Sequence, residues 1–173
     1  MTGLNTLRGQ IFSRLSQLPC PAVLATVSSR GAEARVMMLR HFDPAAGLLR
    51  LYTDAATPKI DEIAAEPGAA LLIYDSALGQ QLRLRVRLSV VMGDSQTFAA
   101  LPAEAQQNYG TMPPPGTPIA AADTYDRQPQ AERFAQIDAL IEEIDFVDLS
   151  TDPHRRARFI RQAETWQESW LAP

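Results

Sequence analysis

The sequence predicts a mainly β fold of the α+β class, in which six or more strands and a few short helices form a small barrel or sandwich. Three observations support this prediction. Runs of strand-favouring apolar residues recur along the chain, and clusters of Gly, Pro, Asp and Ser separate them. The 173 residues, 46% hydrophobic and 21% charged, suit one hydrophobic core. We therefore expect a single domain over residues 1–173.

The first part of the chain predicts one helix and three strands. Apolar residues recur at three- and four-residue steps over 4–18, as on one face of an amphipathic helix, and a proline follows. Strands are expected over 22–28 and 33–42, joined by an "SRG" turn as a hairpin. The turn "DPAAG" leads into a third strand at 48–53, which predicts an antiparallel meander.

The next part predicts a short helix between strands. Thr57-Pro58 is a helix-start signal, because threonine can cap free N–H groups and proline has no N–H to leave unpaired. We expect the helix over 58–66. Strands at 69–74 and 80–91 should follow, separated by the turn "DSALG".

The last part of the chain has the least regular pattern. Asp94 or Ser95 is expected to cap a second helical stretch, and the prolines of 111–118 exclude helix and central strand. Apolar residues within 130–143 have helical spacing. The runs "DFVDLS", "RARFIR" and "TWQESW" predict the closing strands.

Charge and composition exclude several functional classes. The net charge of −4 disfavours nucleic acid as a partner, because nucleic-acid binding needs a basic surface. No apolar segment approaches the roughly 18–20 residues that span a bilayer, so we expect a soluble protein with no membrane partner. The single cysteine, Cys20, cannot form an internal disulfide, and no secretory signal is visible at the N-terminus. A cytoplasmic location follows as an expectation.

Common catalytic motifs are missing from the sequence. His41 and His154 are far apart and Cys20 has no nearby partner, so no metal site is expected. Neither a GxSxG elbow nor a GxxxxGKS phosphate loop is present. The sequence therefore assigns no catalytic residue.

Anion-binding residue types gather in residues 35–59. Two arginines lie on one expected strand, a Tyr-Thr pair ends the next, and a threonine and a lysine begin the short helix, where free N–H groups favour phosphate. A phosphate dianion needs this combination of cations and fixed donors. The residues are Arg35, Arg40, Tyr52, Thr53, Thr57 and Lys59, the last being the only lysine among 16 basic residues.

The order of these motifs resembles the pyridoxamine 5′-phosphate oxidase family of FMN-binding split barrels. That family carries R-x-x-L-L-K, F-Y-T-N, S-R-K and R-Q-V, and this chain reads "RVMMLR" at 35–40, "LYTD" at 51–54, "TPK" at 57–59 and "QQL" at 80–82. The segment "EPGAALLIY" and the ending "WLAP" are similar to further family motifs. The resemblance implies a six- to seven-stranded antiparallel split β-barrel with flanking short helices.

The resemblance also implies a cofactor site at a homodimer interface. FMN phosphate would be held by Arg40, Thr57 and Lys59, while the strand through Leu39 would run alongside the flavin, and Gln81 would come from the second subunit. The cofactor-binding residues implied are Arg35, Val36, Met38, Leu39, Arg40, Tyr52, Thr53, Thr57, Lys59 and Gln81.

The chain departs from the family pattern at several positions. Pro58 replaces an arginine that contacts phosphate, and Arg40 replaces lysine, which keeps the charge but changes its geometry. The substrate-binding Arg-x-His segment has its counterpart in His154 and Arg156, with the residue types reversed. The resemblance therefore implies FMN binding and a small-molecule substrate that the sequence does not identify.

Three functional hypotheses remain open from the sequence. The first is an FMN-dependent oxidoreductase, in which a reduced nitrogenous or nicotinamide substrate passes a hydride to the flavin. The second is a non-catalytic FMN-binding or ligand-binding dimer. The third, a barrel for single-stranded nucleic acid, is disfavoured because "QLRLRVRLSVV" has no aromatic residue for base stacking.

The arginine run at 80–91 has a period of two residues, which predicts two distinct faces. Leucine and valine should fill the barrel from one face. Gln81 and the three arginines share the other, where unpaired guanidinium groups would be costly to bury. We expect this face to lie along the dimer contact, with Gln81 at the flavin and the arginines meeting carboxylates or the flavin's rim.

Overall fold

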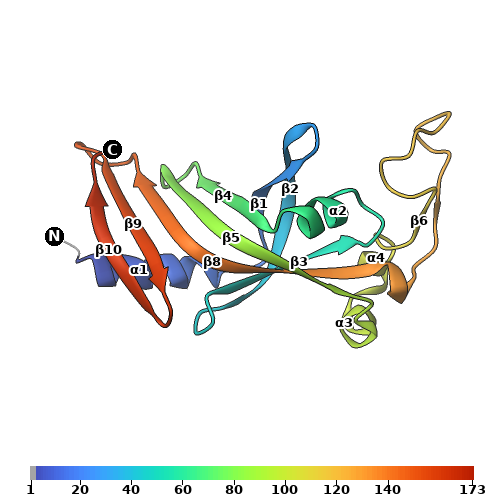
Figure 1. Cartoon of the computed structure of the whole chain (residues 1–173), viewed down its shortest axis with the longest axis horizontal. Helices are drawn as coiled ribbons and strands as arrows, with labels where there is room; N and C mark the ends of the chain where they lie inside the picture. Colours follow the sequence, from blue (N-terminus) through green and yellow to red (C-terminus); the bar gives the residue numbers. More distant parts are fainter. Residues whose placement is uncertain (1–2) are drawn as a thin grey trace.

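The computed structural model describes residues 3–173 and consists mainly of strands (Figure 1). The strands are β1 (Cys20–Ser28), β2 (Gly31–Asp43), β3 (Leu48–Asp54), β4 (Gly68–Asp75), β5 (Gln80–Met92), β6 (Thr111–Met112), β7 (Asp126–Arg127), β8 (Phe134–Asp148), β9 (Arg155–Gln162) and β10 (Thr165–Leu171). The helices are α1 (Leu4–Leu15), α2 (Lys59–Ala65), α3 (Ser95–Ala100), α4 (Ala103–Gln106) and the 3-10 turn η1 (Ala131–Arg133).

Six antiparallel strands close into a barrel. The sheet order is β10-β9-β8-β3-β2-β1-β4-β5, and β5 pairs again with β8, which closes the ring. Strands β9 and β10 extend from β8 beyond the barrel, and α1 lies beside them (Figure 1). The prediction of a mainly β, antiparallel split barrel with short helices is confirmed.

The inward half of the arginine run fills the barrel as predicted. Leu82, Leu84, Val86 and Leu88 are all buried, whereas the arginines between them are exposed. Helix α1 adds Leu7, Ile11 and Leu15 to the same core, and Ile63 of α2 contributes from another side. The core is therefore a continuous apolar cluster that fixes the positions of the surrounding strands.

The helical spacing within 130–143 proved misleading, because this segment forms most of β8. Two features obscure the strand period. The first four residues of β8 are all buried, so both faces are covered there. Farther along, the pairing of β8 with β5 shifts register between Arg85 and Val86, which leaves Glu142 as an extra residue, and such a bulge interrupts the alternation of faces.

The two helix starts after β3 and β5 differ in their capping. Asp94 caps α3 as expected, because its carboxylate accepts a hydrogen bond from the Thr97 amide at 3.0 Å. The cap expected from Thr57 is wrong. Pro58 occupies the capping position of α2, and the Thr57 hydroxyl donates to the Asp54 carbonyl oxygen at 2.8 Å.

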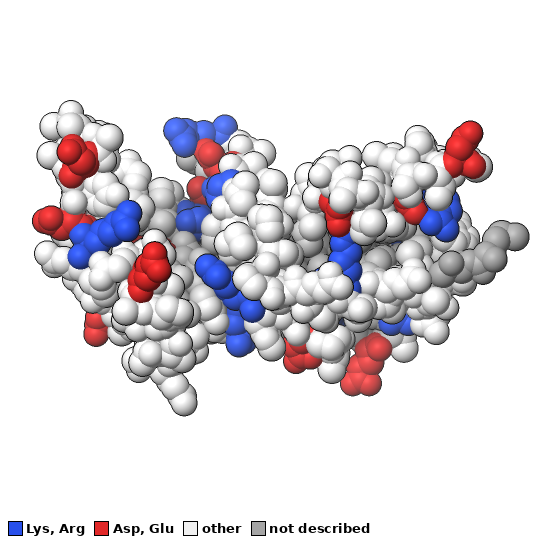
Figure 2. All heavy atoms as spheres, turned by 180° about the vertical axis from the view of Figure 1, so that it is seen from behind, with Lys and Arg blue, Asp and Glu red and all other residues white. Residues whose placement is uncertain are grey.

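The surface combines charges of both signs. On the face seen in Figure 2, basic and acidic side chains are scattered over a largely uncharged surface, without a continuous basic stripe. None of the helices within residues 3–173 is long and apolar enough to cross a membrane.

Candidate functional site

Three of the residues expected at the cofactor site, two of them expected to hold phosphate, lie together where β3 ends and α2 begins. The Lys59 ammonium donates to the Thr53 hydroxyl at 3.0 Å, and that hydroxyl lies 3.3 Å from the hydroxyl of Thr57. We call Thr53, Thr57 and Lys59 the Lys59 cluster. It places one cation and two hydroxyl groups within hydrogen-bonding distance of one another, as an anionic oxygen group requires.

The Lys59 ammonium is partly removed from water. Burial lowers the pKa of Lys59, the nearby Arg35 guanidinium lowers it further, and the carboxylates of Glu62 and Asp54 oppose this shift. None of the ion pairs among residues 3–173 includes Lys59 or Arg40. A bound dianion would therefore supply the negative charge that this position lacks.

Arg35 lies beside the Lys59 cluster but is already paired. Its guanidinium contacts the Glu62 carboxylate at 2.9 Å, and Thr26 donates to the same carboxylate oxygen at 2.5 Å. Burial acts to raise the pKa of Glu62, but the hydrogen bonds from Thr26 and Arg35 outweigh it and hold that pKa below its ordinary value. Arg35 thus ties β2 to α2.

The other β2 residues of the expected site divide between two faces. Leu39 is fully buried in the barrel, so only its backbone can reach a ligand, whereas Val36 is 67% exposed on the outer surface. Met38 is half-buried, and Arg40 is exposed at a register shift between Leu39 and His41. A bulge of this kind redirects the side chain of the extra residue.

Tyr52 joins an aromatic cluster that the sequence did not reveal. Its ring lies 5.0 Å from that of Phe134, and Tyr109 packs edge-on against Phe134 at the same distance. Burial raises the pKa of Tyr109, and the charge of Arg40 partly counteracts the effect. The cluster therefore brings residues near 109 to the end of β3. No sequence spacing predicts this contact, because the residues are far apart in the chain.

Gln81 does not approach the Lys59 cluster within one chain. Thr53 pairs with Ala135 of β8, whereas Gln81 pairs with Val147, twelve residues farther along the same strand. At about 3.3 Å per residue, this separation is roughly 40 Å along the strand.

The expected substrate residues also lie toward the end of β8 that pairs with Gln81. Arg156 forms a bidentate pair with the buried Asp145, with N–O distances of 3.0 and 2.7 Å, and Arg83 binds the same carboxylate at 2.5 Å. His154 is exposed, and its Nδ1 lies 2.9 Å from the Thr151 carbonyl oxygen. In one chain, these residues do not join the Lys59 cluster.

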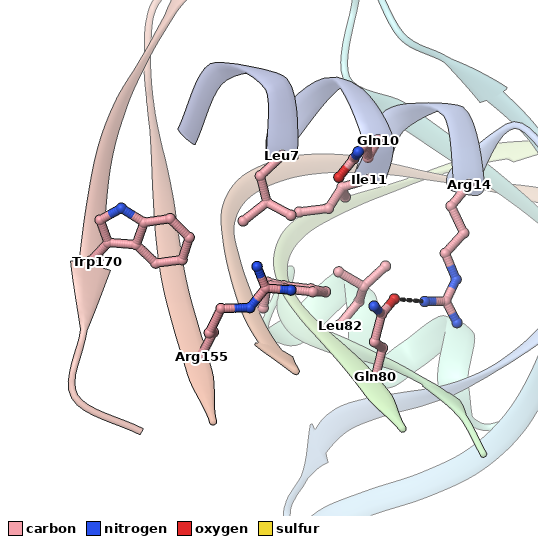
Figure 3. A pocket seen from close by; sticks show the side chains of 9 residues that line it. Leu7, Gln10, Ile11, Arg14, Gln80, Leu82, Arg155 and Trp170 are labelled. Carbon is pink, nitrogen blue, oxygen red and sulfur yellow. Dashed lines mark hydrogen bonds between the residues drawn. The ribbon is translucent and has the colours of Figure 1, made fainter. Parts of the chain in front are cut away.

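A small cavity of about 80 Å³ separates α1 from the strands at this end (Figure 3). Arg14 lines the cavity and donates a hydrogen bond to the Gln80 side chain at 2.9 Å. Arg155 of β9 and Trp170 of β10 line it from the other side. Both arginines have carboxylate partners, Asp75 and Asp148. The cavity therefore has no unbalanced charge.

Comparisons with known proteins identify the fold and the domain. Residues 8–92 match the family model described as "Pyridoxamine 5′-phosphate oxidase, FMN-binding domain". A comparison with the curated proteins finds no match.

Among solved structures, a pyridoxamine 5′-phosphate oxidase-related, FMN-binding protein from Nostoc punctiforme is similar, with a TM-score of 0.79 and 22% identity over 100% of this chain and 98% of that one. PhzG from Burkholderia lata, solved with tetrahydrophenazine-1-carboxylic acid, has a TM-score of 0.69 and 20% identity over 98% and 90%. At these identities, the structures establish the common fold. The chain therefore resembles the pyridoxamine 5′-phosphate oxidase-related FMN-binding proteins: residues 8–92 match the FMN-binding domain of that family, and the fold is shared.

Proposed function

We propose that the protein is an FMN-dependent oxidoreductase that acts as a homodimer on a small-molecule substrate. The observation that carries the proposal is the Lys59 cluster, where a half-buried ammonium with no carboxylate partner among residues 3–173 meets two hydroxyl groups. When bound, FMN supplies the electron chemistry, and the protein supplies orientation and charge.

The residues present suit FMN chemically. Lys59, Thr57 and Arg40 would hold the phosphate, with Arg35 and Thr53 behind them, and a phosphate monoester favours such charge-assisted donors. The outward side chains of Val36 and Met38 offer apolar surface for a flat ring, and the β2 backbone through Leu39 offers polar groups beside it. Tyr52 borders the same region through its contact with Phe134.

The position of Gln81 favours a site completed by a second copy of the chain. If Gln81 contacts the flavin held by Lys59, the separation along β8 favours a Gln81 that comes from another protomer. A twofold dimer provides this arrangement, because each copy both gives and receives the same residue.

A suitable contact surface lies on the outside of the barrel, and we call it the β2–β5 outer face. Its cross-strand rows run from β2 through β1 and β4 to β5, as in Val36, Val23, Leu72 and Arg83, and in Ala34, Ala25, Ala70 and Arg85. Val36 is 67% exposed, and Tyr74, directly opposite Gln81, is 57% exposed. The rows are apolar from β2 to β4 and end on arginines of β5, and an apolar surface with a charged rim is typical of a subunit interface.

The substrate would bind near residues from β9 of the partner, on the same side as Gln81. Arg156 is committed to Asp145, so it would act by fixing that carboxylate, whereas His154 remains exposed. The Arg158 Nε atom is buried without a hydrogen-bond partner among residues 3–173. The substrate itself stays unassigned.

The visible spectrum of the purified protein tests the proposal. We expect a flavin absorption band, either at once or after FMN is added and excess removed. Anaerobic mixing with pyridoxamine phosphate, NADH or NADPH should then bleach that band. A protein that takes up no FMN refutes the proposal, whereas a flavoprotein that none of these donors bleaches favours the alternative of a non-catalytic FMN-binding dimer.

A further inference from the structure

Asp54, the last residue of β3, carries a buried carboxylate that binds three separate segments. The residue is 4% exposed. Its Oδ1 accepts hydrogen bonds from the Ala56 amide at 2.8 Å and from Arg133 Nε at 3.0 Å, and its Oδ2 accepts one from the Gly110 amide at 2.8 Å. Arg133 Nη2 lies 2.8 Å from Oδ1 as well. Since a buried charge is tolerated only with such partners, this geometry is strongly specified.

Gly110 and Arg133 lie near the two ends of the long segment that connects α4 to β8, and we call this connecting segment the excursion. Near its base the outgoing and returning segments lie side by side, because the Tyr109 carbonyl oxygen accepts a hydrogen bond from the Gln130 amide at 3.0 Å. Gly110 has φ of +117°, and a Cβ there would lie 1.9 Å from the Gln128 carbonyl oxygen. Asp54 therefore fastens both ends of the excursion to β3.

The excursion lies next to the Lys59 cluster. A Cβ on Gly116, in the proline-rich loop, would be in ordinary contact with the Pro58 ring at 3.9 Å. Burial raises the pKa of Tyr109, and Arg40 is near enough for its charge to oppose that rise. In Figure 1, β6 and its loop lie at the end of the molecule that α4 also occupies. Because prolines stiffen this loop, its position depends on how its base is held.

We propose that Asp54 is a positioning residue of the cofactor site, whose carboxylate holds segment 109–118 as a wall beside the Lys59 cluster. This inference rests on the proposed function. The segment lies beside Pro58, since a Cβ built on Gly116 would be 3.9 Å from the Pro58 ring, and Pro58 neighbours both Thr57 and Lys59. The carboxylate that ends β3 would therefore position this wall through its bond to Gly110.

The test compares Asp54→Asn with Asp138→Asn in the full-length chain. Asparagine keeps the shape of Asp54 but removes the charge that binds Arg133, and its amide N–H₂ would face a donor. The control removes the Arg50–Asp138 pair, a 2.8 Å ion pair between β3 and β8 that does not include the excursion. We expect the FMN dissociation constant to rise about tenfold in Asp54→Asn and to stay unchanged in Asp138→Asn.

Limited proteolysis gives a second readout that does not depend on activity. Cleavage within 113–125 should be faster in Asp54→Asn than in wild type or Asp138→Asn, because one base of the excursion is released. If Asp54→Asn does not fold, Arg133→Gln removes the same ion pair from the other side and should give both effects.

The outcomes separate this inference from the proposed function. Wild-type protein that takes up no FMN refutes the proposed function, and the inference falls with it. Wild-type protein that binds FMN, together with unchanged affinity in Asp54→Asn and Arg133→Gln, refutes the inference alone. An equal loss of FMN affinity in Asp138→Asn also refutes the inference, because general destabilisation of the protein would then explain the weaker binding.

Discussion

Lys59 combines two properties that rarely coincide in a surface residue. It is the only lysine of the chain, and its ammonium is half-buried beside two threonine hydroxyls. Burial and the charge of Arg35 lower its pKa, so the charged form is less favourable here than in water. A phosphate dianion would reverse this effect by supplying the opposite charge.

Replacing Lys59 should weaken FMN binding strongly. We expect Lys59→Ala to raise the FMN dissociation constant by about 10- to 100-fold, since a charge-assisted hydrogen bond contributes roughly 1.5–3 kcal/mol. Fluorescence titration with FMN measures the change. The control is Lys59→Arg, which keeps the charge and should retain much of the affinity. Unchanged binding in Lys59→Ala would remove this residue from the site.

The pH dependence of binding follows from the lowered pKa of Lys59. As pH rises, the ammonium loses its proton at a lower pH than an ordinary lysine does, and its attraction for phosphate is lost with it. We expect FMN affinity in wild type to decline at a lower pH than an ordinary lysine would allow, and to stay level there in Lys59→Arg, because arginine remains charged. Parallel decline in both proteins would contradict the assignment.

At the scale of the elements, β8 shows why local pattern and tertiary structure disagree. It pairs with β3, β5 and β9, so its surroundings change along its length: consecutive residues are buried at its start and again at 144–146, and burial alternates between them. The apolar spacing reflects these neighbours rather than a helix. Thr57 is a second case in which the local pattern misled. Its hydroxyl does not cap α2, because it donates a hydrogen bond to the Asp54 carbonyl oxygen at the end of β3.

The ion pairs that join β5, β8 and β9 predict acid sensitivity. Hydrogen bonds from Arg156, followed by the charges of Arg156 and Arg83, hold the pKa of the buried Asp145 below its ordinary value despite burial. A carboxyl whose pKa is lower in the folded state adds stability above its unfolded-state pKa, and this stability is lost as pH falls through the folded-state value.

Urea unfolding of wild type and Asp145→Asn measures this contribution. We expect Asp145→Asn to be less stable at pH 7, because Arg83 and Arg156 lose their carboxylate. The difference between the two proteins should shrink as pH falls toward the folded-state pKa of Asp145. A difference that is constant over this range would assign the loss to packing rather than charge.

At the scale of the whole molecule, the barrel keeps Lys59 and Gln81 apart within one chain and exposes an apolar surface between them. The β2–β5 outer face ends at Gln81 on one side and includes exposed Val36 on the other. A second copy packed against it would cover this surface and bring the two halves of the site together.

Mixing two variants that each bind FMN poorly tests whether the site is shared between subunits. Lys59→Ala and Gln81→Ala should each bind FMN poorly, but a heterodimer of the two has one site with both residues intact. Random exchange of subunits should restore about one site in four. Analytical ultracentrifugation measures the oligomeric state, and FMN titration measures the number of binding sites. If FMN binding does not recover after subunit exchange has been verified, Lys59 and Gln81 do not act across the interface, and the shared site is contradicted.

The sequence by itself determined the strand-rich barrel, the inward leucines of β5 and the order of the motifs that resemble the FMN-binding family. These follow from side-chain periodicity, turn chemistry and short spacings, which are local properties. Only the tertiary structure decided that Arg35 is paired with Glu62, that Arg156 is committed to Asp145, and that Asp54 binds Gly110 and Arg133. Each of these contacts joins residues far apart in the chain, and strand pairing, not sequence spacing, sets which side chains meet.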